Sequence, residues 1–174
     1  MQRTAWIRAW VFLGIVATGS RCLAVEDAPA VAKASAVDRM VGRRVSDFTL
    51  TDVLSKRDVK LYGYAGKAGV VLVFTGTQCP VGDLYLPRLV ELNREYGPKG
   101  IVFLGINANA GDSDEEIAAH AREFHVDFPM LRDRANFVAD SVMAERTPEV
   151  VVLDGLARIR YRGAIDDQYA VGAR

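Results

Sequence analysis

The stretch VVLVFTGTQCP, residues 70–80, carries a lone cysteine from a strand pattern into a helix pattern. Residues 70–75 form a continuous apolar and β-branched run, which is typical of a strand buried on both faces. After a three-residue turn come Cys79 and then Pro80, a residue type that often occupies the first position of a helix. We therefore expect Cys79 to lie where a central strand ends and a helix begins.

Two interpretations of Cys79 are open. The unpaired N–H groups and the positive dipole end of a helix N-terminus favour the thiolate over the thiol, and the thiolate is the nucleophile. A free cysteine can equally be a small, buried apolar residue. Its position at a helix start, at the rim of a sheet, favours the reactive cysteine.

Residues 1–24 have the pattern of an export signal. Arg3 and Arg8 form a positive region, residues 10–19 are uncharged and apolar over a length too short to span a bilayer, and small residues lead up to Ala24. We predict cleavage after Ala24 and an exported protein that is periplasmic or extracytoplasmic.

Cys22 allows an alternative, the lipidated cysteine of a lipoprotein, but Arg21 directly before it fits a lipidation motif poorly. Cleavage after Ala24 would discard Cys22 and leave one of the two cysteines of the chain. One sulfur cannot form an intrachain disulfide, so any oxidation chemistry at Cys79 must involve a second molecule.

The mature chain is predicted to hold an alanine-rich linker, residues 25–40, and one domain, residues 41–174. Loss of Arg3, Arg8 and Arg21 with the signal lowers the 22 basic residues to 19, against 22 acidic residues. This slightly negative balance does not indicate nucleic acid or an anionic membrane surface as a partner.

Within the domain, short apolar runs alternate with amphipathic segments, which predicts a three-layer α/β fold with a central mixed sheet. The order of strand, helix and strand around Cys79 predicts a βαβ crossover with residues 70–75 as the central strand. Asp154 and Gly155 predict the turn of a closing hairpin. The predicted strands are residues 45–50, 60–64, 70–75, 101–106, 128–131, 150–153 and 158–161, and the predicted helices are residues 80–96, 114–124 after a capping box at Ser113, and 135–143.

Several stretches together resemble the thioredoxin-fold redoxins. They are FTGTQCPVG at residues 74–82, Pro87, TPEVVVLD at residues 147–154 and the closing hairpin. The resemblance is to the exported thiol-disulfide oxidoreductases and to the alkyl hydroperoxide reductase/thiol-specific antioxidant type, and it covers residues 41–169. It implies that Cys79 is the nucleophile.

The resemblance also implies roles for three further residues. Pro87 should kink the helix that Cys79 begins, and Pro148 should be a cis-proline facing the thiol. Thr147 and Pro148 would then bind substrate, because the extended backbone before the cis-proline can pair with a peptide as an added strand.

The sequence departs from both subfamilies at the site. Where thioredoxins have a second cysteine, a tryptophan and a buried acid, this chain has Gly82, Gln78 and Val73. Where peroxiredoxins have a proline and a threonine before the cysteine, it has Leu72 and Gly76. A dithiol cycle is therefore absent, and peroxide reduction would need a modified site.

Three polar residues near Cys79 are candidate donors to the reacting atoms. Attack by a thiolate on a peroxide or a disulfide places negative charge on the leaving atom, and nearby N–H and hydroxyl groups can stabilise it. Thr75, Thr77 and Gln78 supply such groups, although each can equally be an ordinary turn residue.

Metal and nucleotide sites are not predicted, and no cofactor is expected. His120 and His125 lack the partners of a zinc site and are better explained as solvated or capping residues. The acidic residues 112–116 lack the glycine of a calcium loop and suit a helix N-terminus. Residues 63–67 lack the spacing of a phosphate-binding loop.

Two classes of function remain. The first is an exported oxidoreductase with antioxidant activity, in which Cys79 reduces a hydroperoxide or a protein disulfide and an external thiol or thiol protein resets it. The second is a redox-inactive binding module that holds a peptide or partner domain at the cis-proline groove, with Cys79 incidental.

A further expectation concerns the last residues. In redoxins a final helix follows the closing hairpin and covers one sheet face, but this sequence stops at Arg174. The fold is therefore expected to lack that C-terminal helix, and an uncovered apolar sheet face would favour self-association.

Overall fold

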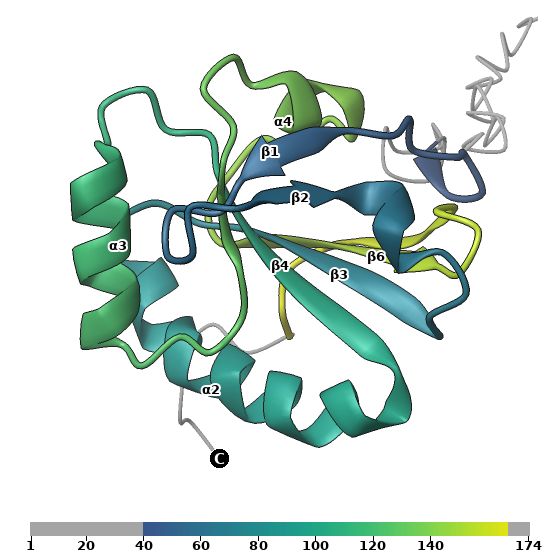
Figure 1. Cartoon of the computed structure of the whole chain (residues 1–174), viewed down its shortest axis with the longest axis horizontal. Coiled ribbons are helices and arrows are strands. Elements are labelled where there is room, and N and C mark those ends of the chain that lie inside the picture. The colour runs from purple at the N-terminus through teal and green to yellow at the C-terminus, as the bar shows by residue number, and fades with distance from the viewer. Residues whose placement is uncertain (1–39, 167–174) are drawn as a thin grey trace, which may run out of the picture. The chain divides into compact units, whose positions relative to one another are not determined.

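The computed structural model describes residues 40–166 of the chain (Figure 1). The predicted export signal, residues 1–24, lies outside the described residues, as does nearly all of the predicted linker, residues 25–40. The end of the predicted domain, from residue 167 onward, also lies outside them.

A five-stranded mixed sheet forms the middle layer (Figure 1). Its strands, in spatial order, are β5 (Met130–Arg132), β4 (Ile101–Asn107), β3 (Gly69–Phe74), β6 (Glu149–Asp154) and β7 (Ile159–Gly163). The strands β3, β4 and β5 are parallel, whereas β6 and β7 are antiparallel to their neighbours. The predicted central strand, crossover and closing hairpin are thereby confirmed. All six residues of β3 are buried, as expected for a strand covered on both faces.

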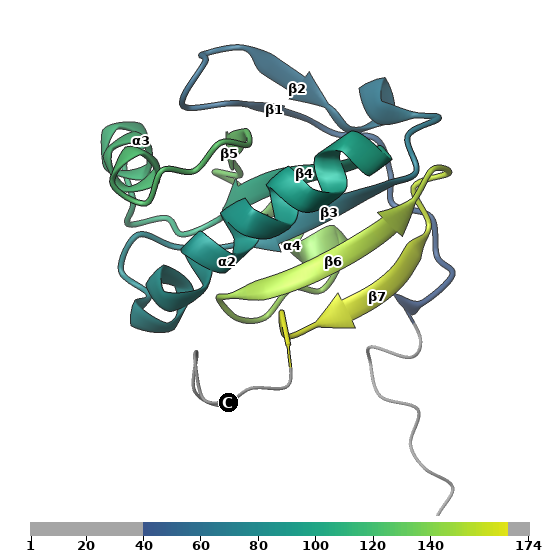
Figure 2. The ribbon, with the colours of Figure 1, turned by 90° about the horizontal axis from the view of Figure 1, so that it is seen from below.

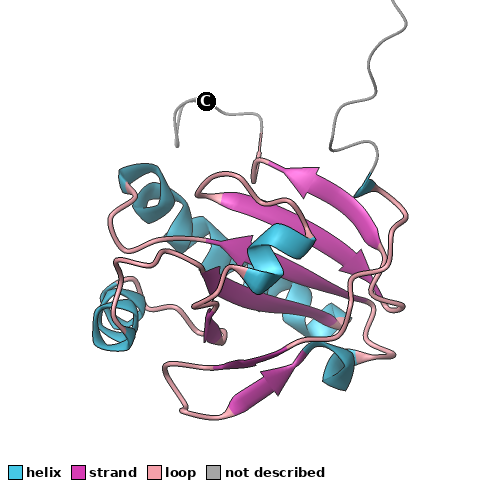
Figure 3. Cartoon of the chain, turned by 90° about the horizontal axis from the view of Figure 1, so that it is seen from above, coloured by secondary structure: helices cyan, strands magenta, loops and turns pink. Residues whose placement is uncertain are grey.

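Helices cover both faces of the sheet, so the predicted three layers are confirmed (Figures 2 and 3). The helices α2 (Pro80–Tyr96) and α3 (Asp114–Glu123) pack on one face. The short helix α4 (Phe137–Ser141) packs on the other, together with the N-terminal part of the domain. That part contains the strands β1 (Thr49–Thr51) and β2 (Asp58–Lys60) and the 3₁₀ helix η1 (Leu61–Tyr64).

The two long helices begin where the sequence predicts. Pro80 is the first residue of α2, and the helix continues through the exposed Pro87 to Tyr96. Ser113 caps α3 with both hydrogen bonds of a capping box, one from the Glu116 N–H and one to the Glu116 side chain. These local signals fix the start of each helix, and thus the direction in which α2 leaves the sheet.

Three predicted elements differ from the structure. Of residues 60–64 only Lys60 lies in a strand, at the end of β2, because the Tyr62 N–H donates to the Asp47 carboxylate and residues 61–64 turn into η1. Only part of residues 45–50 pairs as a strand, since β1 begins at Thr49. The helix predicted over residues 135–143 is shorter, because Asn136 and Met143 have positive φ values of 56° and 57°.

An apolar hollow of about 330 Å³ lies between α2 and the sheet face formed by β3, β4, β6 and β7. It is lined by Val71, Leu89, Leu92, Tyr96, Ile101, Phe103, Val150, Val152, Tyr161 and Ile165. The expected self-association through this face stays a prediction. No helix within residues 40–166 is long and apolar enough to cross a membrane.

Candidate active site

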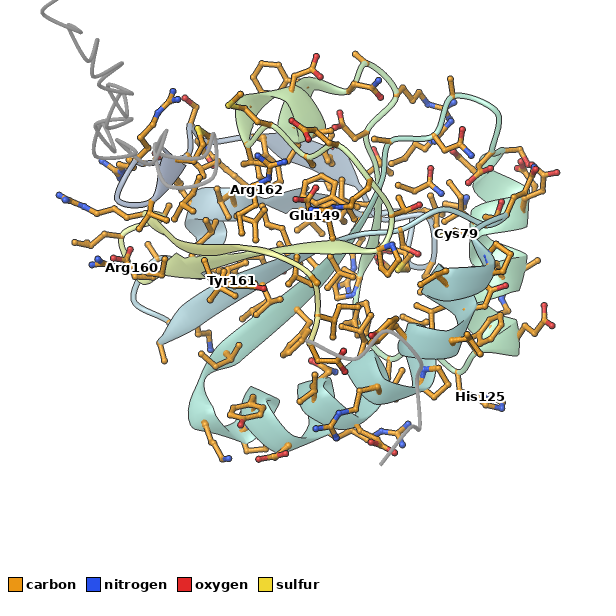
Figure 4. The ribbon with its side chains drawn as sticks, turned by 180° about the vertical axis from the view of Figure 1, so that it is seen from behind. Cys79, His125, Glu149, Arg160, Tyr161 and Arg162 are labelled. Atoms are coloured by element: carbon orange, nitrogen blue, oxygen red, sulfur yellow. The ribbon has the colours of Figure 1, made fainter. Side chains whose placement is uncertain are left out.

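Cys79 is the N-cap residue of α2, at the end of the sheet where β3 leads into the helix (Figure 4). Its backbone is extended, with φ −101° and ψ 100°, and its Sγ accepts a hydrogen bond from the Gly82 N–H at 3.3 Å. The thiol in turn donates to the Thr147 carbonyl oxygen at 3.2 Å. Cys79 is half-buried, so these two hydrogen bonds fix the sulfur while a substrate can still reach it.

The Thr147–Pro148 peptide bond is cis, as the resemblance predicts. Pro148 directly precedes β6, which pairs with β3, the strand that leads to Cys79. The sheet therefore brings together two stretches that lie 68 residues apart in the sequence.

The three predicted donors lie in different places. Thr75 is buried at 3% exposure, and its Oγ1 has no hydrogen-bond partner among the described residues. A Cβ atom at Gly82 would lie 3.5 Å from that oxygen. The backbone N–H of Thr77 donates to Asp112, and Gln78 is exposed beside the sulfur and lines the groove described next.

A groove of about 380 Å³ opens beside Cys79. Its buried apolar part comes from Phe74, Ile106 and Ala139, and its rim carries exposed polar side chains. The rim also includes the backbone before the cis-proline, so a bound chain would contact Cys79 and Thr147 together. The polar lining residues are Thr75, Gln78, Asn109, Asn136, Asp140, Glu145, Arg146 and Thr147.

Asp112 supports the loop before Cys79, a role that the sequence analysis missed. It is only 2% exposed, and its Oδ2 accepts hydrogen bonds from the Thr77 N–H at 3.0 Å and from Asn107 Nδ2 at 2.7 Å. Its Oδ1 accepts from Asn109 Nδ2 at 2.9 Å. Burial raises the pKa of Asp112, but the hydrogen bonds from Thr77 and Asn107, with the Arg132 charge, outweigh it and hold the pKa below its ordinary value.

Arg132, at the end of β5, also belongs to this network. Its Nη1 donates to Asn107 Oδ1 at 2.8 Å, and its Nη2 donates to the Asp112 carbonyl oxygen at 2.7 Å. Asn107 ends β4, so the network joins the ends of parallel strands to the Cys79 loop. The sequence did contain one signal for this network: Asn107, a polar residue that directly follows the predicted buried strand 101–106. The ends of such strands meet at one edge of a sheet.

A second buried charge lies directly after the cis-proline. Glu149, the first residue of β6, is 1% exposed, and its Oε1 accepts from Arg162 Nε of β7 at 2.9 Å. Its Oε2 accepts from the Glu145 N–H at 2.9 Å. The sequence analysis quoted Glu149 only as part of the resemblance, because one acidic residue at a strand start gives no sign of a distant arginine.

The two histidines have different environments. The sequence analysis explained His120 as a solvated or capping residue, but its side chain is only 11% exposed and its Nε2 lies 2.8 Å from Asp83 Oδ1 on α2. His125 is exposed and has a positive φ of 54° just after α3 ends, which agrees with the predicted solvated residue (Figure 4).

Comparison with known proteins places this geometry in a family. A model of the AhpC/TSA family matches residues 41–167. The thiol-disulfide oxidoreductase ResA of Geobacillus thermodenitrificans is 30% identical over 120 residues, which is 69% of this chain and 67% of that protein. Its counterpart in Geobacillus kaustophilus is 32% identical over 66% of this chain and 63% of its own length, so the chain spans about two thirds of these relatives.

Solved structures share the fold. An uncharacterized conserved protein of Geobacillus kaustophilus is 31% identical with a TM-score of 0.72, and the match covers 77% of this chain and 74% of that one. The peroxidoxin BcpB of Mycobacterium tuberculosis, at 21% identity, has a TM-score of 0.62 over 71% of this chain and 84% of that one, which shows the fold alone. These matches confirm the predicted thioredoxin-like fold and the redoxin resemblance. The chain belongs to the AhpC/TSA family of thioredoxin-fold, thiol-dependent oxidoreductases.

Proposed function

We propose that the protein is an exported oxidoreductase in which Cys79 alone attacks a protein disulfide, and that an external thiol resets it. One observation carries this proposal: the thiol lies at the N-terminus of α2 and 3.2 Å from the carbonyl oxygen of the residue before a cis-proline. A sulfur in that place can meet a disulfide that an extended peptide brings along the Thr147 edge.

The site stabilises the reactive form of the sulfur through its own helix. The Gly82 N–H donates to Sγ, and the dipole of α2 adds positive potential there, so both can stabilise negative charge on the sulfur as it attacks. The Thr75 hydroxyl, buried and without a partner in the described part of the chain, is a donor for the charge that develops during attack. Gln78 is a further candidate on the same loop, whereas the Thr77 side chain, the third predicted donor, hydrogen-bonds to Asp112 and would have to leave it to reach the sulfur.

The reaction balances with one sulfur from this protein. The Cys79 thiolate attacks one sulfur of the substrate disulfide, a mixed disulfide forms, and the other substrate sulfur leaves as a thiolate. An external thiolate then attacks the mixed disulfide and releases Cys79. Cys79 is the sole cysteine among residues 40–166, and the proposed export would remove Cys22, so the second step uses that outside thiol.

Hydroperoxide reduction is the second candidate, because the buried Thr75 hydroxyl can equally donate to the oxygen that leaves a peroxide. The thiolate would take one oxygen from the peroxide to form a sulfenic acid, and the alkoxide or hydroxide that leaves would take up a proton. A thiol would then condense with the sulfenic acid, releasing water and giving a mixed disulfide.

One experiment separates these reactions. The mature protein receives one equivalent of either a peptide disulfide or a hydroperoxide, and intact-mass analysis follows Cys79. A mass gain of one peptide supports the disulfide reaction, and a gain of one oxygen supports the peroxide reaction. Cys79→Ser should prevent both while leaving the fold intact, because a hydroxyl is a far weaker nucleophile at neutral pH.

The binding-module alternative is tested by reactivity. Alkylation of Cys79 that remains fast well below pH 8 supports the enzyme, whereas a pH profile like that of an ordinary free cysteine supports the binder. The same preparation tests export, since the mature N-terminus should be Val25, and a lipid on Cys22 would show the lipoprotein alternative to be correct.

A further inference from the structure

Two charged side chains lie inside the apolar core behind the candidate site. Glu149 pairs in register with Phe74 of β3, and Arg162 pairs in register with Val151 of β6. Their side chains are 1% and 2% exposed, and the Arg162 Nε to Glu149 Oε1 distance is 2.9 Å. Figure 4 shows the two residues close to each other, between the sheet and α4.

Such a pair is poorly explained by stability alone. The cost of removing two charges from water often exceeds the gain from their attraction, so apolar residues of similar size commonly serve as well or better. Here, moreover, the buried Arg162 Nη1 has no hydrogen-bond partner among residues 40–166. The pair therefore calls for another role, and its remaining contacts indicate one.

Those contacts lead to the loop before the cis-proline. Glu149 Oε2 accepts a hydrogen bond from the Glu145 N–H, four residues earlier, and the Glu145 carboxylate lies 3.8 Å from Arg162 Nη2. The enclosed segment contains Arg146 and Thr147, both of which line the groove at Cys79. The buried pair thus anchors the segment that forms one wall of the groove. In the same segment, the Thr147 carbonyl oxygen accepts the hydrogen bond from the Cys79 thiol.

We propose that the Glu149–Arg162 pair is a positioning device for peptide disulfides, which fixes residues 145–147 as a rigid edge along which the substrate chain aligns with Cys79. Neither residue touches the reacting atoms, so both are positioning residues. This inference rests on the proposed function and deepens it, because it makes the substrate an extended polypeptide rather than a small disulfide.

The same two strands offer a matched control. Arg160 of β7 pairs with Asp154 of β6 at 2.8 Å, but this pair is exposed, at 59% and 21%. It lies at the far end of the hairpin from Cys79 (Figure 4). Arg160→Met removes an arginine from the same strand without touching the loop before Pro148.

The test compares two disulfides on the double variant Glu149→Met, Arg162→Met. The probes are dithiodipyridine, which needs no peptide edge, and an octapeptide joined through its cysteine to glutathione. The double variant should react with dithiodipyridine within twofold of the wild-type rate and with the octapeptide about ten- to a hundredfold more slowly. Arg160→Met should match the wild type with both probes.

If the double variant does not fold, Glu149→Gln carries the test. It is nearly isosteric but weakens the bonds to Arg162 and Glu145, and we expect a severalfold loss with the octapeptide alone. Equal octapeptide rates in variant and wild type overturn the positioning role, and so does an equal loss with both probes, since the pair would then act on the sulfur. A wild type that reacts with neither probe overturns the proposed function as well.

Discussion

The loop before Cys79 and the loop before Pro148 meet at one sulfur, yet they are anchored differently. The first is tied to Asp112, whose two carboxylate oxygens accept three hydrogen bonds at the polar ends of the strands. The second is tied to Glu149, whose carboxylate lies in the apolar core against an arginine with one unpartnered nitrogen in the described residues. We infer that the first anchor contributes to the stability of the fold and the second to the selection of substrate.

A second cysteine on α2 should have the largest effect, because a disulfide to it would replace the contact of Cys79 with Thr147. A Cβ atom at Gly82 would lie 3.4 Å from Cys79 Cβ and 3.6 Å from its Sγ, close to the separation of about 3.5–4.5 Å found in disulfides. Gly82→Cys should therefore form an intrachain disulfide on mild oxidation, measured as complete loss of titratable thiol in the monomer. In its reduced form it should resolve a mixed disulfide without external thiol. Persistence of two free thiols under oxidant would refute this geometry.

Removal of the first anchor should cost the most stability. Asp112→Ala leaves the Thr77 N–H, Asn107 and Asn109 without their acceptor, and we expect the free energy of unfolding to fall by roughly 3–5 kcal/mol. Urea denaturation measures the loss, and Glu115→Ala, which changes an exposed neighbour, serves as the control. A loss below about 1 kcal/mol would mean that the loop before Cys79 keeps its conformation without Asp112.

The pH dependence of stability should report on the same anchor. The pKa of Asp112 in the folded protein lies below its ordinary value of 3.8. At pH values between the folded and the unfolded pKa, the unfolded chain therefore binds more protons than the folded protein. The stabilisation that Asp112 gives the fold is therefore complete above the unfolded pKa and is lost as the pH falls through the folded pKa. The difference in unfolding free energy between the wild type and Asp112→Asn should shrink on acidification from about pH 7 to about pH 3. Asp154, whose pKa is also lowered, is common to both proteins and cancels. The pKa of Glu116 is lowered too, mainly by its hydrogen bonds to Ser113, but the Asp112 charge raises it, so Asp112→Asn also changes the Glu116 contribution. A difference that stays constant across this range would contradict the prediction.

Replacement of the second anchor should have the smallest effect on stability. Because Glu149→Met with Arg162→Met removes both buried charges together, the free energy of unfolding should change by no more than about 1 kcal/mol or should rise. Arg162→Met alone should instead lose roughly 3–5 kcal/mol, since it leaves the Glu149 carboxylate buried and unpaired. If the double variant proved as unstable as the single one, the contrast between the two anchors would disappear.

Local sequence signals were sufficient for most of the fold. The apolar run before Cys79 predicted the central strand, and the residues that cap α2 and α3 predicted where these helices begin. Errors arose where side chains override the pattern: the Asp47 carboxylate turns residues 61–64 into a 3₁₀ helix, and left-handed Asn136 and Met143 shorten α4.

The candidate site could be predicted only in part. Cys79 and Pro148 stand out by residue type, and the structure places the thiol against Thr147. Asp112 and Arg162 did not stand out, because each acts through a partner distant in sequence: Thr77 lies 35 residues from Asp112, and Glu149 lies 13 residues from Arg162. The first contact depends on the order of the strands and the second on the register of the closing hairpin, and no local pattern contains either.

The register of the central strand bears on how the chain folds as it is made. Gly69 of β3 pairs with Ile101 of β4 and with Asp154 of β6, so one edge of β3 can close early, whereas the other waits for nearly the whole domain. We expect the open edge to delay completion of the sheet, because pairings distant in sequence form slowly. For the exported protein that we propose, this delay would leave the polypeptide extended while it crosses the membrane. Cys79 gains its contact with Thr147 only once β6 has docked.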